Sequence, residues 1–330
     1  MVIKAMAGVP YLFRRLLVSL LLLLAMSFLT FWLMHSTPGN FFDSLKLNPQ
    51  ISEETISRYE RLYHLNDPLV VQYGHWVWNV LRGEFGYSFY YNAPVGPIIG
   101  ARLGNTFVLS LAVFIVTWVL AIPLGIWAAL HRNRWMDHLV SLLSFAAFST
   151  PSFFLAILML YAASQWGILP LGGMRGADYD DLTLFGKIID IGRHLIIPTT
   201  VLALGSIGSL QRIMRGNMLS VLRQQYILAA RAKGLPEHQV IYRHALRNAF
   251  NPLVTLLGYE FASLLSGAAL VEIVCSWPGL GNLMLTAVRA KDVYLVMASL
   301  LMGGVLLLLG NLLADLLLRW VDPRINTVGR

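Results

Sequence analysis

The sequence predicts an all-α integral membrane protein with six transmembrane helices. Of its 330 residues, 57% are apolar and only 13% are charged, whereas a soluble domain has about 45–50% apolar and about 25% charged residues. The mean hydropathy is positive, and six long stretches carry almost no charge. These three observations exclude an ordinary soluble enzyme before any motif is considered.

A helix needs roughly 20 apolar residues to cross the hydrocarbon core of a bilayer, and six stretches meet or approach that length. In chain order they are Leu16–Met34, Asn105–Leu130, Leu139–Gln165, Leu195–Gln211, Asn248–Val271 and Val293–Ala314. The third has Pro151 near its middle, the fourth is the shortest, and the fifth contains one ionisable residue, Glu260. Each stretch is expected to form one span.

The first span could be mistaken for a cleaved signal peptide, because Lys4, Arg14 and Arg15 precede it. Its apolar run of 19 residues is longer than that of a signal peptide, and the following His35-Ser36-Thr37-Pro38 contains no small-x-small cleavage site. We therefore expect the segment to be retained.

The distribution of Lys and Arg predicts that both termini are cytoplasmic. With the N-terminus inside, 15 of the 25 Lys and Arg residues fall on inner segments, as the positive-inside rule requires. Topology and anionic lipid headgroups then explain the formal net charge of +8, so no nucleic-acid partner is expected.

The spans imply three parts. Residues 1–34 form the cytoplasmic N-terminus and first span, residues 35–104 a large outer loop, and residues 105–330 a core with the other five spans. The outer loop has amphipathic patterning over Glu53–Leu65 and a Trp/Tyr-rich stretch over Tyr73–Tyr91, which predict short helices on or above the outer surface. The inner connection, residues 212–247, is long enough to receive a cytoplasmic partner.

The inner connection has the pattern of two helices separated by a bend. Met218–Lys233 is rich in helix-forming residues, and Lys233 followed by Gly234 forms a helix stop. Pro236 suits the first position of a second helix, which is expected to run to about Ala249. By itself this pattern fits either a docking element or a surface helix hairpin on lipid headgroups.

Several motifs of this chain resemble those of one family of transport proteins. In the inner connection they are Ala230-Arg231-Ala232-Lys233-Gly234-Leu235 and Arg243-His244-Ala245-Leu246-Arg247-Asn248-Ala249, followed by Pro252. Elsewhere they are Gly83-Glu84-Phe85-Gly86-Tyr87-Ser88, Ile122-Pro123-Leu124-Gly125, Ser149-Thr150-Pro151-Ser152-Phe153-Phe154, Val271-Glu272-Ile273-Val274, Ser276-Trp277-Pro278-Gly279-Leu280-Gly281 and Asp322-Pro323-Arg324-Ile325. Together they resemble the first transmembrane permease subunit of dipeptide/oligopeptide (Dpp/Opp) ABC importers, over nearly the whole chain.

The resemblance implies a type I ABC importer permease fold in the bacterial inner membrane. It also implies that the inner connection is the "EAA" loop to which an ATPase couples. The coupling residues carried over are Ala229, Ala230, Arg231, Ala232, Lys233, Gly234, Leu235, Arg243 and His244. The general motif begins with a glutamate six residues before the glycine, where this chain has Leu228. A salt bridge to the ATPase from that position is therefore not expected.

No catalytic residues are expected on this chain. No Gly-x-x-x-x-Gly-Lys-Ser/Thr phosphate loop occurs, so ATP and magnesium should be bound by partner ATPase subunits. The partners that the resemblance implies are a second homologous permease, two ATP-binding subunits and an extracytoplasmic substrate-binding protein. One cysteine and eight histidines without metal-ligand spacing predict no metal site.

Two acids are candidates for functional contacts. Glu260 lies near mid-membrane, where an ionisable group is expensive; it could face the pathway, or lie protonated or hydrogen-bonded against the second permease. Glu272, in the last outer loop, could meet the binding protein or a loop of the second permease. Glycines in the spans, including Gly205 and Gly208, predict close helix packing.

The expected cargo is a di- or oligopeptide. Importers of glutathione or nickel chelates in the same family are the alternatives. An ion-coupled secondary transporter would be expected to show inverted repeats and several charged or broken helices, and no convincing repeat relates the two halves of this chain. An intramembrane enzyme would need paired catalytic groups at matching depth, which Glu260 alone does not supply.

Overall fold

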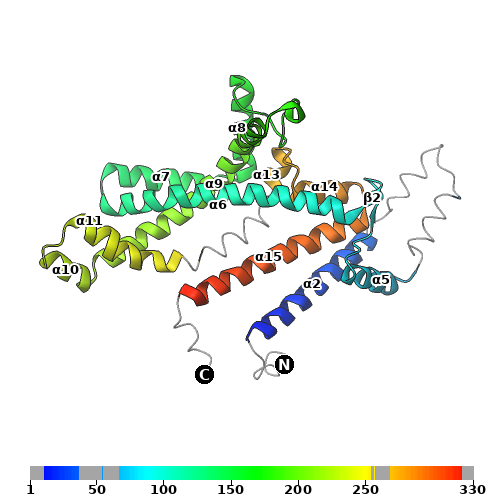
Figure 1. Ribbon diagram of the computed structural model, residues 1–330, viewed down its shortest axis with the longest axis horizontal. Coiled ribbons are helices and arrows are strands. Elements are labelled where there is room, and N and C mark those ends of the chain that lie inside the picture. Colours follow the sequence, from blue (N-terminus) through cyan, green and yellow to red (C-terminus); the bar gives the residue numbers. More distant parts are fainter. Residues whose placement is uncertain (1–10, 37–53, 55–66, 254–255, 257–267, 322–330) are drawn as a thin grey trace. The chain divides into compact units, whose positions relative to one another are not determined.

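The computed structural model describes residues 11–36, 54, 67–253, 256 and 268–321 (Figure 1). The chain divides into two compact units. The first comprises residues 1–104 and 280–308, and the second comprises residues 105–279 and 309–330.

The described residues contain four helices that are long and apolar enough to cross a membrane, or five if a bent pair counts as one span. The four lie within α2 (Tyr11–Ser36), α6 (Val95–Leu130), α9 (Leu184–Leu222) and α15 (Val293–Val321). The bent pair is α7 (Trp135–Ser149) and α8 (Ser152–Trp166). Most of the predicted fifth span, Asn248–Val271, lies outside the described residues, and so does most of the patterned Glu53–Leu65 segment.

In the first unit, α5 (Leu69–Leu81) packs against α2. Trp76 of α5 is 4% exposed and clusters with Phe31 of α2 and Met297 of α15. The hydroxyls of Tyr73 and Ser27 lie 2.8 Å apart. The first half of the Trp/Tyr-rich stretch is therefore helical, as predicted, whereas Tyr87–Ser88 forms a strand. The helix packs into the unit's core because its aromatic side chains find partners on α2.

A second feature of this unit is the attachment of a short hairpin to the start of α15. Strands β1 (Tyr87–Ser88) and β2 (Ala93–Pro94) are antiparallel. The fully buried Asp292 accepts hydrogen bonds from the Ser88 hydroxyl (2.7 Å) and from the Leu295 amide (3.2 Å). Asp292 is thus the N-cap of α15, and it also holds the hairpin. Helix α14 (Leu280–Arg289) completes the unit.

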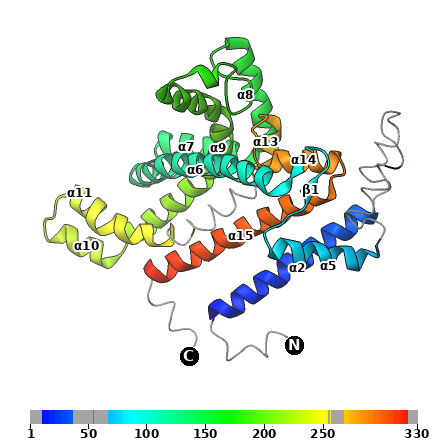
Figure 2. The same ribbon diagram turned by 45° about the vertical axis from the view of Figure 1, so that its right-hand side comes forward.

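In the second unit, the predicted third span is broken into α7 and α8, whose axes differ by 103°. Pro151 has no N–H to donate to the preceding turn, and the residue before a proline is pushed to extended backbone. Thr150 accordingly has φ −89° and ψ 125°. The expectation of one span over Leu139–Gln165 is therefore wrong in its continuity (Figure 2).

The predicted fourth span is also wrong in its length. Instead of 17 residues, α9 has 39 and is about 58 Å long at 1.5 Å per residue. Its N-cap, Thr183, accepts a hydrogen bond from the Gly186 amide. Charged residues such as Arg212 and Arg215 end the apolar run without ending the helix. Likewise, α6 begins at Val95, ten residues before the predicted span.

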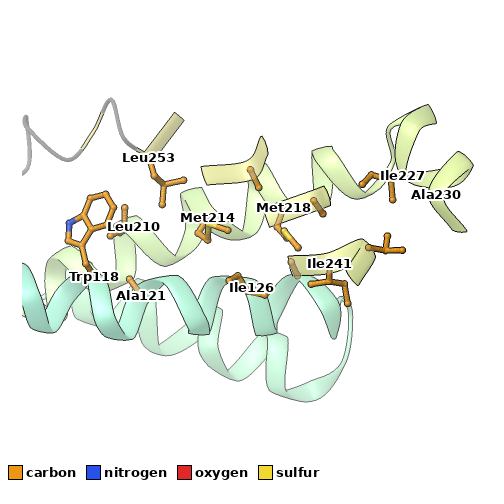
Figure 3. Packing of buried hydrophobic residues seen from close by; sticks show 14 residues of the cluster. Trp118, Ala121, Ile126, Leu210, Met214, Met218, Ile227, Ala230, Ile241 and Leu253 are labelled. Carbon is orange, nitrogen blue, oxygen red and sulfur yellow. The ribbon is translucent and has the colours of Figure 1, made fainter. Parts of the chain in front are cut away.

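The core of the second unit lies between α6 and α9. Trp118, Ala121 and Ile126 of α6 face Leu210, Met214 and Met218 of α9 (Figure 3). The two helices approach closely at Gly125, where an added methyl group would lie 2.7 Å from the Met214 Cβ. Gly208 similarly allows α9 to approach α7, because a methyl group there would lie 2.6 Å from the Ser144 carbonyl oxygen. The packing role predicted for Gly208 is confirmed.

The remaining elements of the second unit are short. They are the 3-10 helix η1 (Tyr179–Asp181), α10 (Gln225–Ala232), α11 (Glu237–Gln239), the π-helix η2 (Val240–Ala245) and α13 (Ala269–Val274). Residues 246–253 continue η2 as α-helix.

Candidate functional site

The candidate coupling residues form a compact helical hairpin, residues 225–245, made of α10, α11 and η2. It lies at one end of the second unit, beyond the ends of α6 and α7 (Figures 1 and 2). The chain enters it from α9 through Arg223 and Gln224, where Gln224 is extended (φ −74°, ψ 147°). The predicted single helix Met218–Lys233 is thus two helices, α9 and α10.

The bend of the hairpin is a Schellman helix stop. The Leu235 amide donates to the Ala230 carbonyl (3.4 Å) and the Gly234 amide to the Arg231 carbonyl (2.9 Å), which is the paired bonding that ends a helix at a left-handed residue. Gly234 has φ +76°, a conformation that favours glycine. The predicted stop at Gly234 is therefore confirmed. A methyl group at Gly234 would meet no atom within 4 Å, so the position needs glycine for its backbone and not for space.

An ion pair closes the hairpin on its outside. The Arg231 Nη2 donates to Glu237 Oε1 (2.6 Å) and its Nε to Oε2 (3.2 Å). Through this hydrogen bond Arg231 holds the pKa of the Glu237 carboxyl below its usual range, and Glu237 raises the pKa of Arg231. Both side chains are substantially exposed, so the pair adds at most about 1 kcal/mol to stability. The pair connects the end of α10 to the start of α11.

One face of the hairpin is buried against α9 and the end of α6. Ile227, Val240 and Ala245 are fully buried in the cluster that contains Met214 and Met218 (Figure 3). A hairpin fixed by such packing moves together with α9, because protein interiors are close-packed and transmit displacement.

The predicted coupling residues divide between the two faces. Ala230 is buried, and Leu235 and His244 are half-buried. The exposed members are Ala229, Arg231, Ala232, Lys233, Gly234 and Arg243. The exposed face therefore offers small side chains and cations together.

Three large exposed side chains were missed as site residues by the sequence analysis. Tyr226, Leu228 and Tyr242 are 43%, 47% and 61% exposed. The Tyr226 hydroxyl accepts a hydrogen bond from the Asn248 amide (2.8 Å), which links α10 to the helix that follows η2. Leu228 stands where the general family motif has glutamate. The sequence signal that could have identified them is the presence of large apolar residues in a strongly basic segment. Exposure of such residues to solvent is unfavourable, so they indicate a contact surface.

A second ionic contact was also missed. Arg215 of α9 donates from Nε to Asp137 Oδ1 (2.7 Å) and from Nη2 to Oδ2 (2.6 Å). Asp137 lies in the first turn of α7 and is 1% exposed. It also accepts from the Asn133 amide (3.0 Å). This contact joins α7 to α9 seven residues before α9 ends.

The carboxylate of Glu272 is buried within this chain. It is 1% exposed and accepts a hydrogen bond from the Thr106 hydroxyl (2.7 Å). The Trp277 indole donates to the Asn105 carbonyl (3.0 Å), and the Asn105 amide donates to the Pro278 carbonyl (2.8 Å). The segment 272–279 is thus fastened to α6 within this chain, and the two suggested contacts of Glu272 with other proteins stay predictions. Glu260, the pathway candidate, lies outside the described residues.

Comparison with protein families gives two matches that together cover most of the chain. Residues 121–327 match the family described as "Binding-protein-dependent transport system inner membrane component". Residues 9–112 match the corresponding N-terminal family, "Binding-prot-dependent transport system membrane comp, N-term".

Relatives of known sequence are similar over almost their full length. The oligopeptide transport system permease protein AppB of Bacillus subtilis is 37% identical over 318 residues, which cover 96% of this chain and 99% of AppB. The dipeptide transport system permease protein DppB of Alkalihalophilus pseudofirmus is 33% identical over 330 residues, covering 96% of this chain and 99% of DppB.

Among solved structures, the inward-facing MetNI methionine ABC transporter matches with a TM-score of 0.55 and 17% identity, covering 68% of this chain and 96% of that one. An amino acid ABC transporter matches with a TM-score of 0.50 and 17% identity, covering 68% and 94%. These structures support the fold.

Proposed function

The chain belongs to the family of binding-protein-dependent transport system inner membrane components, and from this we propose that it forms half of the translocation pathway of an ATP-driven peptide importer. It is a multi-pass protein of the inner membrane and a transport subunit, with ATP hydrolysis carried out by other components of the importer. The observation that carries the proposal is the hairpin 225–245, exposed on one face and packed on α9 by the other.

The hairpin is the proposed docking element for an ATPase subunit. Its exposed face holds Leu228, Ala229 and Ala232 beside cationic side chains, so it can bury apolar surface at the centre and make polar contacts at the rim, as protein interfaces do. ATP and magnesium bind to the ATPase and not to this chain. Movement of the docked subunit reaches α9 through the buried face of the hairpin.

The proposed assembly contains this chain, a second homologous permease, two ATP-binding subunits and an extracytoplasmic substrate-binding protein. In this arrangement both termini and the hairpin face the cytoplasm, in agreement with the surplus of Lys and Arg on those segments. The outer loop, residues 35–104, then faces the binding protein.

The proposed cargo is a di- or oligopeptide, because AppB and DppB are named as oligopeptide and dipeptide permeases. Glutathione and nickel chelates are the alternatives within the family. An ion-coupled secondary transporter is not favoured, since the relatives over nearly the whole chain are permeases of binding-protein-dependent systems.

The test is purification of the complex through a tag on this chain, followed by reconstitution into proteoliposomes with the binding protein outside. A second permease and ATPases should co-purify, and peptide uptake should require ATP inside. Uptake that is driven by an ion gradient without ATPases would refute the proposal.

A further inference from the structure

The second unit contains an open hollow of about 470 Å³ beside the break between α7 and α8. Its wall is built from the end of α7, the start of α8 and the middle of α9. Its polar lining residues are Thr150, Ser152, Ser206 and Ser209. A volume of this size lies within the range of about 300–1,000 Å³ that holds small ligands.

The break in the helix is itself an argument for a polar occupant. Pro151 has no N–H, so the carbonyl of Ala147, which lines the hollow, loses its usual helical donor. Non-helical backbone at membrane depth is tolerated where it is buried in protein or lines a water-filled cavity. The Ala146 carbonyl accepts from both the Thr150 amide (3.1 Å) and the Thr150 hydroxyl (2.8 Å), so the carbonyl that Pro151 leaves without its helical donor is that of Ala147.

The three serine hydroxyls give the second argument. Among the described residues, the hydroxyls of the half-buried Ser152, Ser206 and Ser209 make no hydrogen bond within the chain. A hydroxyl without a partner in an apolar environment is unfavourable. Three of them around one hollow therefore point to water or a polar ligand and not to lipid tails.

Gly205 gives the third argument. It was expected to serve helix packing, but a methyl group at Gly205 would meet no atom within 4 Å, whereas one at Gly208 would lie against the Ser144 backbone. The two glycines are less than one turn apart on α9. Gly208 permits the close contact of α9 with α7, whereas the missing side chain at Gly205 leaves space in the hollow.

We propose that this hollow, lined by Ser152, Gly205, Ser206 and Ser209, is a site through which the main chain of the transported peptide passes. Serine hydroxyls can both donate and accept, so they can exchange hydrogen bonds with peptide N–H and C=O groups whatever the side chains. The site would thus pass many peptide sequences. This inference rests on the proposed function and adds the residues that meet the cargo.

The first test fills the hollow. Gly205→Leu places a bulky side chain on the wall of the hollow, at a position where a methyl group would meet nothing within 4 Å. The matched control is Gly192→Leu on the same helix, where a methyl group also meets nothing within 4 Å. In the reconstituted complex, Gly205→Leu should lose uptake of a peptide digest while ATP hydrolysis continues, and Gly192→Leu should retain both. Normal uptake by Gly205→Leu would overturn the inference.

The second test measures whether water reaches the hollow and whether the peptide then occupies it. Ser206→Cys and Ser209→Cys are introduced singly into the otherwise unchanged chain, whose single natural cysteine is unreactive because burial raises the pKa of the Cys275 thiol to about 11. A charged, membrane-impermeant methanethiosulfonate should label both variants in the assembled complex. The peptide digest, supplied with binding protein, should slow that labelling.

The alternative occupants give different results. Reaction with a lipid-soluble maleimide only would show that lipid fills the hollow, and labelling of the free chain but not of the complex would assign it to the second permease; either result overturns the inference. If the wild-type complex took up no peptide while both cysteines were still labelled from water, the proposed cargo would be wrong and the water-filled hollow would stand.

Discussion

Arg215 of α9 holds the carboxylate of Asp137 at the start of α7 with two charge-assisted hydrogen bonds of 2.7 and 2.6 Å. In the sequence Arg215 contributes only to the inner positive charge. In the structure it ties α7 to α9 between the hairpin 225–245 and the hollow at Pro151. The contact therefore joins two of the three helices that line the hollow, close to the proposed ATPase-docking element.

Breaking this pair should destabilise the chain. Asp137→Asn leaves the Arg215 guanidinium without its counter-charge, and we expect a loss of about 2–4 kcal/mol, somewhat below that of a fully buried pair because the Arg215 side chain is 25% exposed. Thermal unfolding of the purified chain in detergent would measure it. Arg215→Lys keeps the charge but not the bidentate geometry, so its loss should be smaller. Equal losses in both variants would contradict this account.

Gly234 provides a test of the hairpin's bend. Gly234→Val forces a β-branched residue into a left-handed conformation, which costs about 1–2 kcal/mol, while Gly234→Asn tolerates it better. We expect the valine variant to assemble poorly with the ATPase and to lose uptake, and the asparagine variant to keep most of both. Co-purification and ATP-driven uptake are the measurements. Equal ATPase binding and equal uptake in the two variants would show that coupling does not require the left-handed backbone conformation at Gly234.

Leu228 tests whether the exposed face is a contact surface. Leu228→Asp places a charge on an exposed position, so folding should be almost unaffected. A central contact is worth about 2 kcal/mol, so ATPase binding should weaken about 30-fold. Leu182→Asp, at a residue 37% exposed beside η1, is the control and should bind the ATPase normally. Unchanged binding by the Leu228 variant would exclude this side chain from the interface.

Gly125 tests the packing of α6 on α9. Gly125→Ala brings a methyl group within 2.7 Å of the Met214 Cβ and 2.8 Å of the Gln211 carbonyl oxygen, and overpacking of this kind costs about 1–3 kcal/mol. Gly104→Ala lies on the same helix with nothing within 4 Å and should be neutral or slightly stabilising. Melting temperatures of the two variants in detergent would decide; a melting temperature unchanged in both would argue against the close approach.

Local signals in the sequence predicted the parts of the site that local chemistry controls. The stop at Gly234 follows from a left-handed position that only a few residues tolerate. The break at Pro151 was not predicted, because the uncharged run Leu139–Gln165 indicated one span; the missing N–H of the proline explains the break that the structure shows. The length of α9 was underestimated because hydropathy ends at Arg212 while backbone hydrogen bonding does not. The burial of Glu272 depends on Thr106, 166 positions away, and no local pattern reveals such a partner.

A proline also determines where α9 bends most easily. Pro198 lies inside that helix and gives no hydrogen bond to the turn before it, so bending concentrates near His194–Pro198. From Thr199 to Leu222 the helix has no such interruption. This uninterrupted segment contains Ser206 and Ser209 and leads directly into the hairpin 225–245. A movement of the docked ATPase would therefore displace both serines together as a rigid segment of α9, with the bending at Pro198.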